Sequence, residues 1–258
     1  MDKRGAAFNR WWTYQHDWQE DEGEVIEELP ISIYVNGIEI ATMMGTPLNQ
    51  DWLGVGFLKN EGILDEIDEI EILKITPEGC CVDIWLNRGV TIPSRKIITS
   101  GCGGGITYTD PGTGVEPFQS EIVTTPAQIQ NGFNNLQTKE SLYVRSRGVH
   151  AAGLLNPSSG ELELIVEDVG RHNTIDKVRG ASMMKGIATQ DKIMLCTGRI
   201  SSEMLHKSAL MGCPILASRT SPTSLSVEIA KSWNMTLVGY VRNNRLRVYS
   251  APQRLGIS

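Results

Sequence analysis

Residues 162–173 read Leu162-Glu-Leu-Ile-Val-Glu-Asp-Val-Gly-Arg-His-Asn173. The apolar run at the start of this segment is typical of a buried strand, and Ile175 and Val178 then follow at helical spacing. The same order recurs twice, with Lys192–Cys196 before a helix over Ser201–Met211 and Pro214–Ala217 before a helix over Thr223–Trp233. Apolar strands alternating with helices favour a parallel or mixed sheet covered on both faces. The sequence therefore predicts an α/β fold for this portion.

The predicted α/β domain extends over residues 125–258. Thr125 and Pro126 mark the start of its first helix, because threonine is a favoured N-cap and proline is favoured at the first helical position. Two further strands are expected before the end of the chain, over Met235–Val241 and Leu246–Tyr249, on either side of Asn243-Asn244.

The preceding residues, 25–102, favour strands. Apolar and polar residues alternate from Leu29 to Thr42 around Asn36-Gly37, a pair that favours the tight turn of a β-hairpin. Helical spacing over Trp52–Glu61 stops at Gly62. Further strands are expected over Glu69–Ile75, Cys81–Leu86 and Val90–Ile98.

Two segments show no such patterns. Residues 1–24 are polar, carry scattered tryptophans and lack periodicity, so we expect a loosely held arm. Residues 103–124 begin with a stretch rich in glycine, proline and threonine, which indicates a linker or flap.

The composition limits the classes of function. A net charge of −6 gives the 258-residue chain no general attraction to nucleic acid or to an anionic membrane. No signal peptide and no apolar run long enough to span a bilayer is found at the N-terminus. The cysteines are Cys80, Cys81, Cys102, Cys196 and Cys213, with no C-x-x-C spacing, so neither a disulfide framework nor a zinc knuckle is indicated. We expect a reduced, cytoplasmic protein without nucleic-acid or membrane partners.

Arginines follow the four predicted strands of the α/β portion. They are Arg171, Arg199, Arg219 and Arg242, the last followed by Arg245. Ligands of open α/β sheets bind beyond the carboxyl ends of the strands, where helix N-termini and arginines favour phosphate. The pattern predicts a site for a polyanionic small molecule, with His172 and Ser201 as further donors. The alternative is that these arginines pair with Glu167, Asp168 and Asp176 and only stabilise loops.

Two histidines raise separate questions. His172 has three possible roles, as a base, a phosphate donor or a structural cap, and the sequence does not rank them. His150 lies in Gly148-Val-His-Ala-Ala152, which invites comparison with the H-x-E and P-C-x-x-C motifs of zinc nucleobase deaminases. Ala152 occupies the position of the glutamate and no C-x-x-C follows, so we expect no catalytic zinc.

Cys102 lies in Ser100-Gly-Cys-Gly-Gly-Gly105, with glycine on both sides. Each glycine loses much backbone entropy when it is ordered and has no side chain to pack, so we expect an open loop. In such a loop a sulfur atom of another protein could reach the Cys102 thiol. The alternative is a small apolar side chain in a tight turn.

Several segments together resemble the FdhD family of formate dehydrogenase accessory sulfurtransferases. They are Val166–Asn173 with Asp176-Lys177, Thr197–Glu203, Ser221–Leu225, Val55–Ile63 and Gly148–Ala152. The resemblance covers roughly residues 27–254. It implies a C-terminal domain of cytidine-deaminase-like α/β fold without the deaminase zinc.

The resemblance implies a sulfurtransferase that takes a persulfide from a cysteine desulfurase and passes the sulfur to the molybdenum bis(molybdopterin guanine dinucleotide) cofactor of formate dehydrogenase. Cys102 matches the family's persulfide-bearing cysteine, whereas Gly105 replaces the second cysteine of its usual C-x-x-C. Family members are expected to be homodimers. The cofactor-binding stretch of the family falls on Tyr240, Val241, Arg242, Asn243, Asn244 and Arg245, and GDP would mimic part of the cofactor.

Two rival functions follow from the same residues. The first is a chaperone that only binds the molybdenum cofactor, with Cys102 structural, and Gly105 favours it. The second is a zinc-free nucleotide hydrolase on a deaminase scaffold, for which the sequence offers no recognisable pair of general bases.

Overall fold

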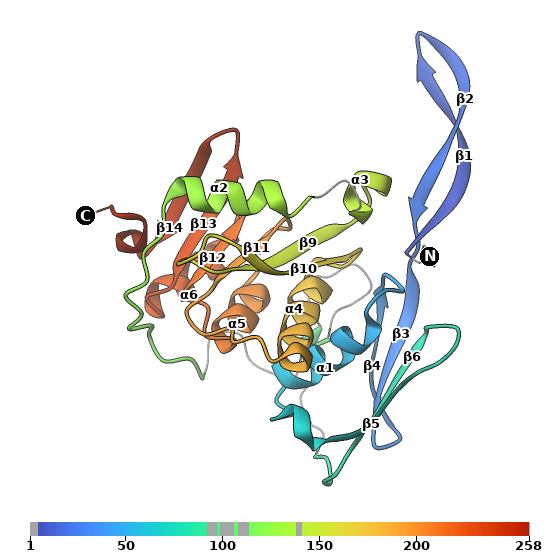
Figure 1. Ribbon diagram of the computed structural model, residues 1–258, viewed down its shortest axis with the longest axis horizontal. Helices are drawn as coiled ribbons and strands as arrows, with labels where there is room; N and C mark the ends of the chain where they lie inside the picture. Colours follow the sequence, from blue (N-terminus) through green and yellow to red (C-terminus); the bar gives the residue numbers. More distant parts are fainter. Residues whose placement is uncertain (1–4, 92–96, 99–105, 108–113, 138–140, 258) are drawn as a thin grey trace.

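The computed structural model describes residues 5–91, 97–98, 106–107, 114–137 and 141–257. It contains a six-stranded sheet covered by helices, a four-stranded sheet and a hairpin that projects from the body (Figure 1). Among the residues described, no helix combines the length and the apolar character needed to cross a bilayer.

The six-stranded sheet is mixed, as the alternation of strands and helices predicted. Its order is β10-β9-β11-β12-β13-β14. The three strands β11, β12 and β13 are parallel, and β9 runs antiparallel to both β10 and β11. The bounds are β9 (His150–Leu155), β10 (Leu162–Asp168), β11 (Ile193–Cys196), β12 (Ile215–Ser218), β13 (Thr236–Arg242) and β14 (Arg245–Ser250). The sequence did not predict β9, although it lies beside the centre of the sheet.

Helices cover both faces of this sheet (Figure 1). One face packs against α2 (Pro126–Asn135) through Ile129 and Phe133, and the other against α4 (Arg171–Lys185), α5 (Ser202–Leu210) and α6 (Ser224–Ser232). The predicted start of α2 is confirmed by a capping box, in which Thr125 Oγ1 accepts from Gln128 N at 3.1 Å. Gln128 Oε1 accepts in turn from Thr125 N, also at 3.1 Å. A short helix, α3 (Leu142–Ser146), precedes β9.

The four-stranded sheet is formed by the N-terminal portion, in the order β4-β3-β6-β5. Its predicted hairpin is confirmed, and both turn residues, Asn36 (φ 47°) and Gly37 (φ 78°), have the positive φ of a type I′ turn. The elements are β3 (Leu29–Val35), β4 (Ile38–Gly45), α1 (Gln50–Asn60), the 3₁₀ turn η1 (Ile67–Glu69), β5 (Ile70–Ile75) and β6 (Cys81–Leu86).

The last strand predicted for this portion, over residues 90–98, differs from the structure. Val90 and Thr91 lie outside any strand, and residues 92–96 lie outside the described part of the chain. Only β7 (Ile97–Ile98) is a strand there, and it pairs with β8 (Ile106–Thr107) rather than with the four-stranded sheet.

The two portions are joined where α1 crosses α4. A Cβ atom on Gly56 of α1 would overlap the carbonyl oxygen of Asp176 in α4, and one on Gly180 of α4 would overlap that of Trp52 in α1. The helices therefore touch backbone to backbone, a distance that only glycine permits. This contact fixes the four-stranded sheet against the α/β body.

The N-terminal arm differs from the sequence prediction, which expected no regular structure over residues 1–24. It forms an antiparallel hairpin of β1 (Ala6–Gln15) and β2 (Asp17–Ile26), with His16 (φ 69°) at the turn. Most of its side chains are exposed on both faces. Because neither face is buried by the body, the sequence carries no alternation of apolar and polar residues to indicate strands.

Candidate functional site

The arginines predicted to share one edge of the sheet do so. Since β9 is antiparallel to both β10 and β11, β10 runs in the same direction as β11, β12 and β13. Arg171, Arg199 and Arg219 follow the first three of these strands, and Arg242 is the last residue of β13. All four therefore lie at the carboxyl edge, where ligands of open α/β sheets bind.

Arg219 is used by the fold. Its guanidinium donates to Gln137 Oε1 at 3.1 Å and to the carbonyl oxygen of Phe133 at 3.0 Å, at the C-terminal end of α2. Helix C-termini leave carbonyl groups unsatisfied and favour cations. Arg219 therefore caps α2. Arg199, in contrast, is exposed, and its side chain forms no ion pair among the residues described.

His150 and Arg171 meet at Gly198. A Cβ on this glycine would lie 2.7 Å from Arg171 Cβ and 3.4 Å from His150 Nδ1, so the position needs glycine for both side chains to approach. The His150 ring also lies 3.4 Å from Thr197 Oγ1. Burial, followed by the charge of Arg171, lowers the pKa of His150, which favours the neutral ring.

His172 lies between a hydroxyl and a carboxylate. Its Nδ1 is 2.8 Å from Glu203 Oε2, and its Nε2 is 3.3 Å from Ser201 Oγ. Ser201 is also the N-cap of α5, where its Oγ accepts from Met204 N at 3.3 Å. Both ring nitrogens of His172 thus have partners, which fix the ring at the start of two helices.

Glu203 is buried beneath His172 and is also 3.2 Å from Lys207. Burial alone would raise the pKa of Glu203, but Lys207 and His172 lower it well below its ordinary value. Glu203 is therefore a carboxylate that holds the His172 ring. The sequence analysis gave Glu203 no role of its own and named it only as the last residue of the family-like segment Thr197–Glu203.

A cavity of about 850 Å³ lies at the turn between β13 and β14. It is lined by Pro126, Tyr240, Arg242, Asn243, Asn244, Arg245, Leu246 and Arg247. An adjoining cavity of about 290 Å³ extends along α2 past Ala127 and Gln130. The predicted stretch 240–245 thus surrounds a cavity, except that the Val241 side chain is fully buried.

Tyr240 organises this cavity. Its φ of 55° is rare for a residue other than glycine, and it falls where the pairing of β13 with β14 shifts register. The Arg247 guanidinium lies 4.4 Å from the centroid of the Tyr240 ring, and that of Arg242 lies 5.9 Å from it. The sequence analysis missed Arg247, although Arg245 and Arg247 have the spacing of one strand face.

The carboxylates that could have neutralised the strand-end arginines have other partners. Glu167 accepts from the backbone N–H groups of Leu142 and Tyr143, at 2.7 and 3.0 Å. Asp168 pairs with Lys177 at 2.6 Å, and Asp176 pairs with Lys207 at 2.9 Å. These contacts disfavour the alternative in which the three carboxylates exist to pair with the arginines.

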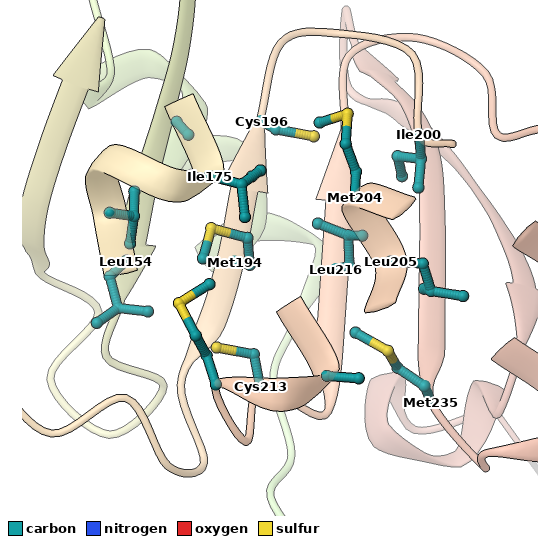
Figure 2. Close-up of a cluster of buried hydrophobic side chains, with 14 of the residues drawn as sticks. Leu154, Ile175, Met194, Cys196, Ile200, Met204, Leu205, Cys213, Leu216 and Met235 are labelled. Carbon is teal, nitrogen blue, oxygen red and sulfur yellow. The ribbon is translucent and has the colours of Figure 1, made fainter. Parts of the chain in front are cut away.

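The cysteines differ in accessibility. Cys102, with its whole glycine loop, lies outside the described residues. Cys196 and Cys213 are buried in the core beneath the sheet (Figure 2), and burial raises the pKa of each to about 12. Burial also raises the pKa of Cys81. Within the described part of the chain, no group of three or more histidine, cysteine or acidic side chains is placed to hold a metal ion.

The sequence profile of the FdhD/NarQ family matches residues 26–256, nearly the whole described body. The chain belongs to the FdhD/NarQ family. The resemblance drawn from the sequence motifs is thereby confirmed.

Bacterial FdhD proteins are similar to this chain over most of their length. The sulfur carrier protein FdhD of Staphylococcus aureus is 33% identical over 240 residues, which cover 90% of this chain and 89% of that protein. The sulfur carrier protein FdhD of Listeria monocytogenes is 35% identical over 246 residues, 92% of this chain and 94% of that protein. A crystal structure of a formate dehydrogenase accessory protein from Desulfotalea psychrophila has a TM-score of 0.80 and 29% identity, covering 97% of this chain and 99% of that one.

Proposed function

We propose that this FdhD/NarQ protein is a sulfur carrier that accepts a persulfide sulfur on Cys102 and passes it to a molybdenum cofactor for formate dehydrogenase. The observation that carries the proposal is the match over residues 26–256 to a family whose relatives are named sulfur carrier proteins. The accessory protein from Desulfotalea psychrophila suggests formate dehydrogenase as the client.

Cys102 is proposed as the carrier partly because the other thiols are poorly suited. A thiol reacts as its thiolate, and the raised pKa values of Cys196 and Cys213 leave almost none of that form near neutral pH. The glycines on both sides of Cys102 leave room for a second protein.

The transfer to Cys102 is a thiol exchange. The Cys102 thiolate attacks the terminal sulfur of a cysteine desulfurase persulfide. A new S–S bond forms at Cys102 as the S–S bond of the donor breaks, and the donor cysteine leaves as a thiolate. The product is a persulfide on Cys102.

The acceptor is treated as a substrate, molybdenum bis(molybdopterin guanine dinucleotide), and its outer parts are guanine nucleotides with pyrophosphates. The cavity at the β13–β14 turn fits such a polyanion, because Arg242, Arg245 and Arg247 line it together with two asparagines. The Tyr240 ring would offer a face to a planar base. Arg171 and Arg199, with the His172 and Ser201 pair, would extend the positive edge toward β10.

The carrier step is tested by incubating the protein with a cysteine desulfurase and cysteine, followed by intact-mass analysis. The wild type should gain the mass of one sulfur atom, and a reductant should remove it. Cys102→Ala should gain none, whereas Cys80→Ala, the matched control in the partly exposed adjacent pair, should gain it as the wild type does. Sulfur retained by Cys102→Ala would refute the assignment.

A second candidate, a chaperone that binds the cofactor without carrying sulfur, is favoured by Gly105, which stands where the family has a second cysteine. The same experiment separates the two. A wild type that binds GDP yet gains no sulfur from the desulfurase would favour the chaperone.

A further inference from the structure

A further cavity, of about 590 Å³, lies at the edge of the six-stranded sheet that is opposite to the strand-end arginines. Its lining includes Thr189 and Gly212, which come just before the parallel strands β11 and β12 and so mark the amino ends of those strands. Residues of α4 and α5, which lie side by side on this face of the sheet, complete the lining (Figure 1). The cavity shares no lining residue with the one at the β13–β14 turn.

Arg179 of α4 supplies the positive charge of this cavity. Its Nε atom is buried, and its guanidinium forms no hydrogen bond or ion pair with the residues that the structure describes. Burial lowers the pKa of Arg179, but the ordinary value of 12.5 is so far above neutral that the side chain stays charged. A buried polar group without a partner is costly, so this guanidinium indicates a partner from outside the chain.

The neighbouring acidic groups do not neutralise Arg179. Cys213 and Glu66 are the groups whose charge would favour the protonated arginine. Burial raises the pKa of Cys213 to about 12, so its thiol is neutral near neutral pH. Glu66 is exposed to water, as is Glu116 at the rim of the cavity, and neither forms an ion pair with Arg179.

The fold does not use Arg179 to cap the helix end beside it. Helix C-termini leave carbonyl groups that a cation could satisfy, and α5 ends at this cavity. The carbonyl oxygen of Met211 accepts instead from Thr189 Oγ1 at 2.6 Å, and that of Ala209 accepts from Gly212 N at 2.8 Å. The guanidinium of Arg179 is therefore left for a ligand.

The walls around this cation are largely apolar. Val115 and Phe118 line the cavity from the segment before α2, and both pack against the core on this face of the sheet. Phe118 N also donates to the carbonyl oxygen of Trp233 at 2.8 Å, which fixes this wall to the end of α6. Leu210, an exposed apolar side chain at the end of α5, lies on another side. Apolar walls with one charged group are typical of small-molecule sites.

We propose that this cavity binds a monocarboxylate with an apolar body, whose carboxylate accepts hydrogen bonds from the Arg179 guanidinium. The planar fork of arginine matches the two oxygens of a carboxylate, and the apolar body packs on Val115 and Phe118. The carboxylates of Glu66 and Glu116 disfavour a dianion such as a phosphate monoester. A free carboxylic acid and the C-terminus of a peptide share this chemistry. The site is independent of the sulfur transfer proposed above.

Proton–nitrogen NMR spectra of the full chain, titrated with hexanoate, test the site. The Arg179 Nε–H signal and the backbone amide signal of Gly212 should shift and saturate, whereas uncharged hexanamide should leave the Arg179 signal in place. Arg179→Gln should raise the Kd for hexanoate about tenfold or more, as for the loss of a charge-assisted hydrogen bond. Arg147→Gln, which replaces an exposed arginine after α3, is the matched control and should leave the Kd unchanged.

Further probes identify the source and the charge of the ligand. N-acetyl-phenylalanyl-leucine represents the end of a peptide chain, and tighter binding of this probe than of hexanoate would identify a peptide C-terminus. Tighter binding of hexanoate would identify a free acid. Hexyl phosphate should bind no more tightly than hexanoate, and GDP should not displace hexanoate, because the β13–β14 cavity is separate.

Urea unfolding of Arg179→Gln separates a ligand site from a structural role. Because the guanidinium is unpaired, its removal should leave the midpoint of unfolding unchanged or raise it. A lower midpoint together with unchanged hexanoate binding would assign Arg179 to the fold and overturn the proposal. Hexanoate that shifts no signal of Arg179, equal binding of hexanoate and hexanamide, or tighter binding of hexyl phosphate would overturn it as well.

Discussion

Two sets of cations in this protein have opposite surroundings. Lys177 and Lys207, on the helices beneath the sheet, are buried and lie 2.6 Å from Asp168 and 2.9 Å from Asp176. Arg242 and Arg245, at the β13–β14 cavity, are exposed and have no carboxylate partner in the part of the chain that the structure describes. The buried lysines are committed to the fold, whereas these arginines are open to a ligand.

The buried pair of Asp168 and Lys177 also connects the two portions of the chain. Asp168 Oδ2 accepts from Thr46 N at 3.1 Å, just after β4, and its Oδ1 accepts from Asn173 Nδ2 at 2.8 Å. Asn173 donates further to the carbonyl oxygen of Met44 at 2.8 Å. Residues of the family motif over 166–173 therefore anchor the four-stranded sheet to the α/β body, independently of any ligand.

Breaking this buried pair should have the largest effect. Lys177→Met leaves the Asp168 carboxylate buried without its cation, so the free energy of unfolding should fall by about 3–5 kcal/mol. Urea unfolding followed by circular dichroism measures the change. Lys231→Met, at the exposed end of α6, is the control and should stay within about 0.5 kcal/mol of the wild type. A loss of less than about 1 kcal/mol for Lys177→Met would contradict the structural role.

The opposite result is expected at the cavity. Arg245→Ala should leave the free energy of unfolding within about 0.5 kcal/mol of the wild type. It should weaken GDP binding by about 1.5–3 kcal/mol, the range for a charge-assisted hydrogen bond. Calorimetry measures the affinity, and Lys74→Ala on β5 removes a cation elsewhere as the control. Unchanged affinity in Arg245→Ala and in Arg242→Ala would place the phosphate site elsewhere.

Much of the fold could be predicted because burial imposes a pattern on the sequence. The strands β10 to β13 and helices α4 to α6 alternate as apolar and amphipathic segments, and Asn36-Gly37 and Thr125-Pro126 mark a turn and a cap. The strand β9 was missed, since Gly153 lies inside it and no helix connects it to β10. Neither face of the arm is buried by the body, so no alternation marked β1 and β2.

The candidate site was predicted less completely. Strands that run in the same direction have their carboxyl ends at the same edge of the sheet. The placement of the arginines at that edge therefore followed from their positions after the strands in the sequence. Side-chain direction did not follow. Arg219 turns toward α2, and the stacking of Arg247 on Tyr240 depends on a register shift that no local pattern indicates.

The pH dependence of stability sharpens the comparison further, through Glu203. The pKa of Glu203 is lower in the folded state than its value near 4.5 in the unfolded state. The ionised carboxylate therefore stabilises the fold at pH values above about 4.5, and this contribution is lost as the pH falls toward the pKa of the folded state. Glu203→Gln should lower the free energy of unfolding by about 1.5 kcal/mol at neutral pH. The effect is smaller than for Lys177→Met because Lys207 keeps Asp176 as a partner.

Urea unfolding of Glu203→Gln and the wild type at several pH values measures this dependence. The difference between the two proteins should narrow below about pH 4.5, where the wild-type contribution is being lost. Glu228→Gln on α6, an exposed carboxyl group, is the matched control and should follow the wild type at every pH. A constant difference across the pH range would mean that shape rather than charge is what Glu203 contributes.

The smallest effect is expected where a lysine is paired but accessible to water. Lys192 lies 2.8 Å from Glu163, about the separation of the buried Lys177 pair, yet their side chains are 16% and 28% exposed. Burial raises the pKa of Glu163, but Lys192 and Asn156 lower it by more, so the carboxyl group stays ionised and the ion pair stays intact.

Water can replace either partner of the Lys192–Glu163 pair when the other is removed. Lys192→Met should therefore cost about 0.5 kcal/mol, and added salt should reduce that difference. If urea unfolding instead gave the same loss of unfolding free energy for Lys192→Met as for Lys177→Met, the ion pair alone, whether buried or accessible to water, would determine how much each lysine stabilises the fold. A small, salt-sensitive loss would instead identify burial as the property that separates the lysines of the core from the arginines of the cavity.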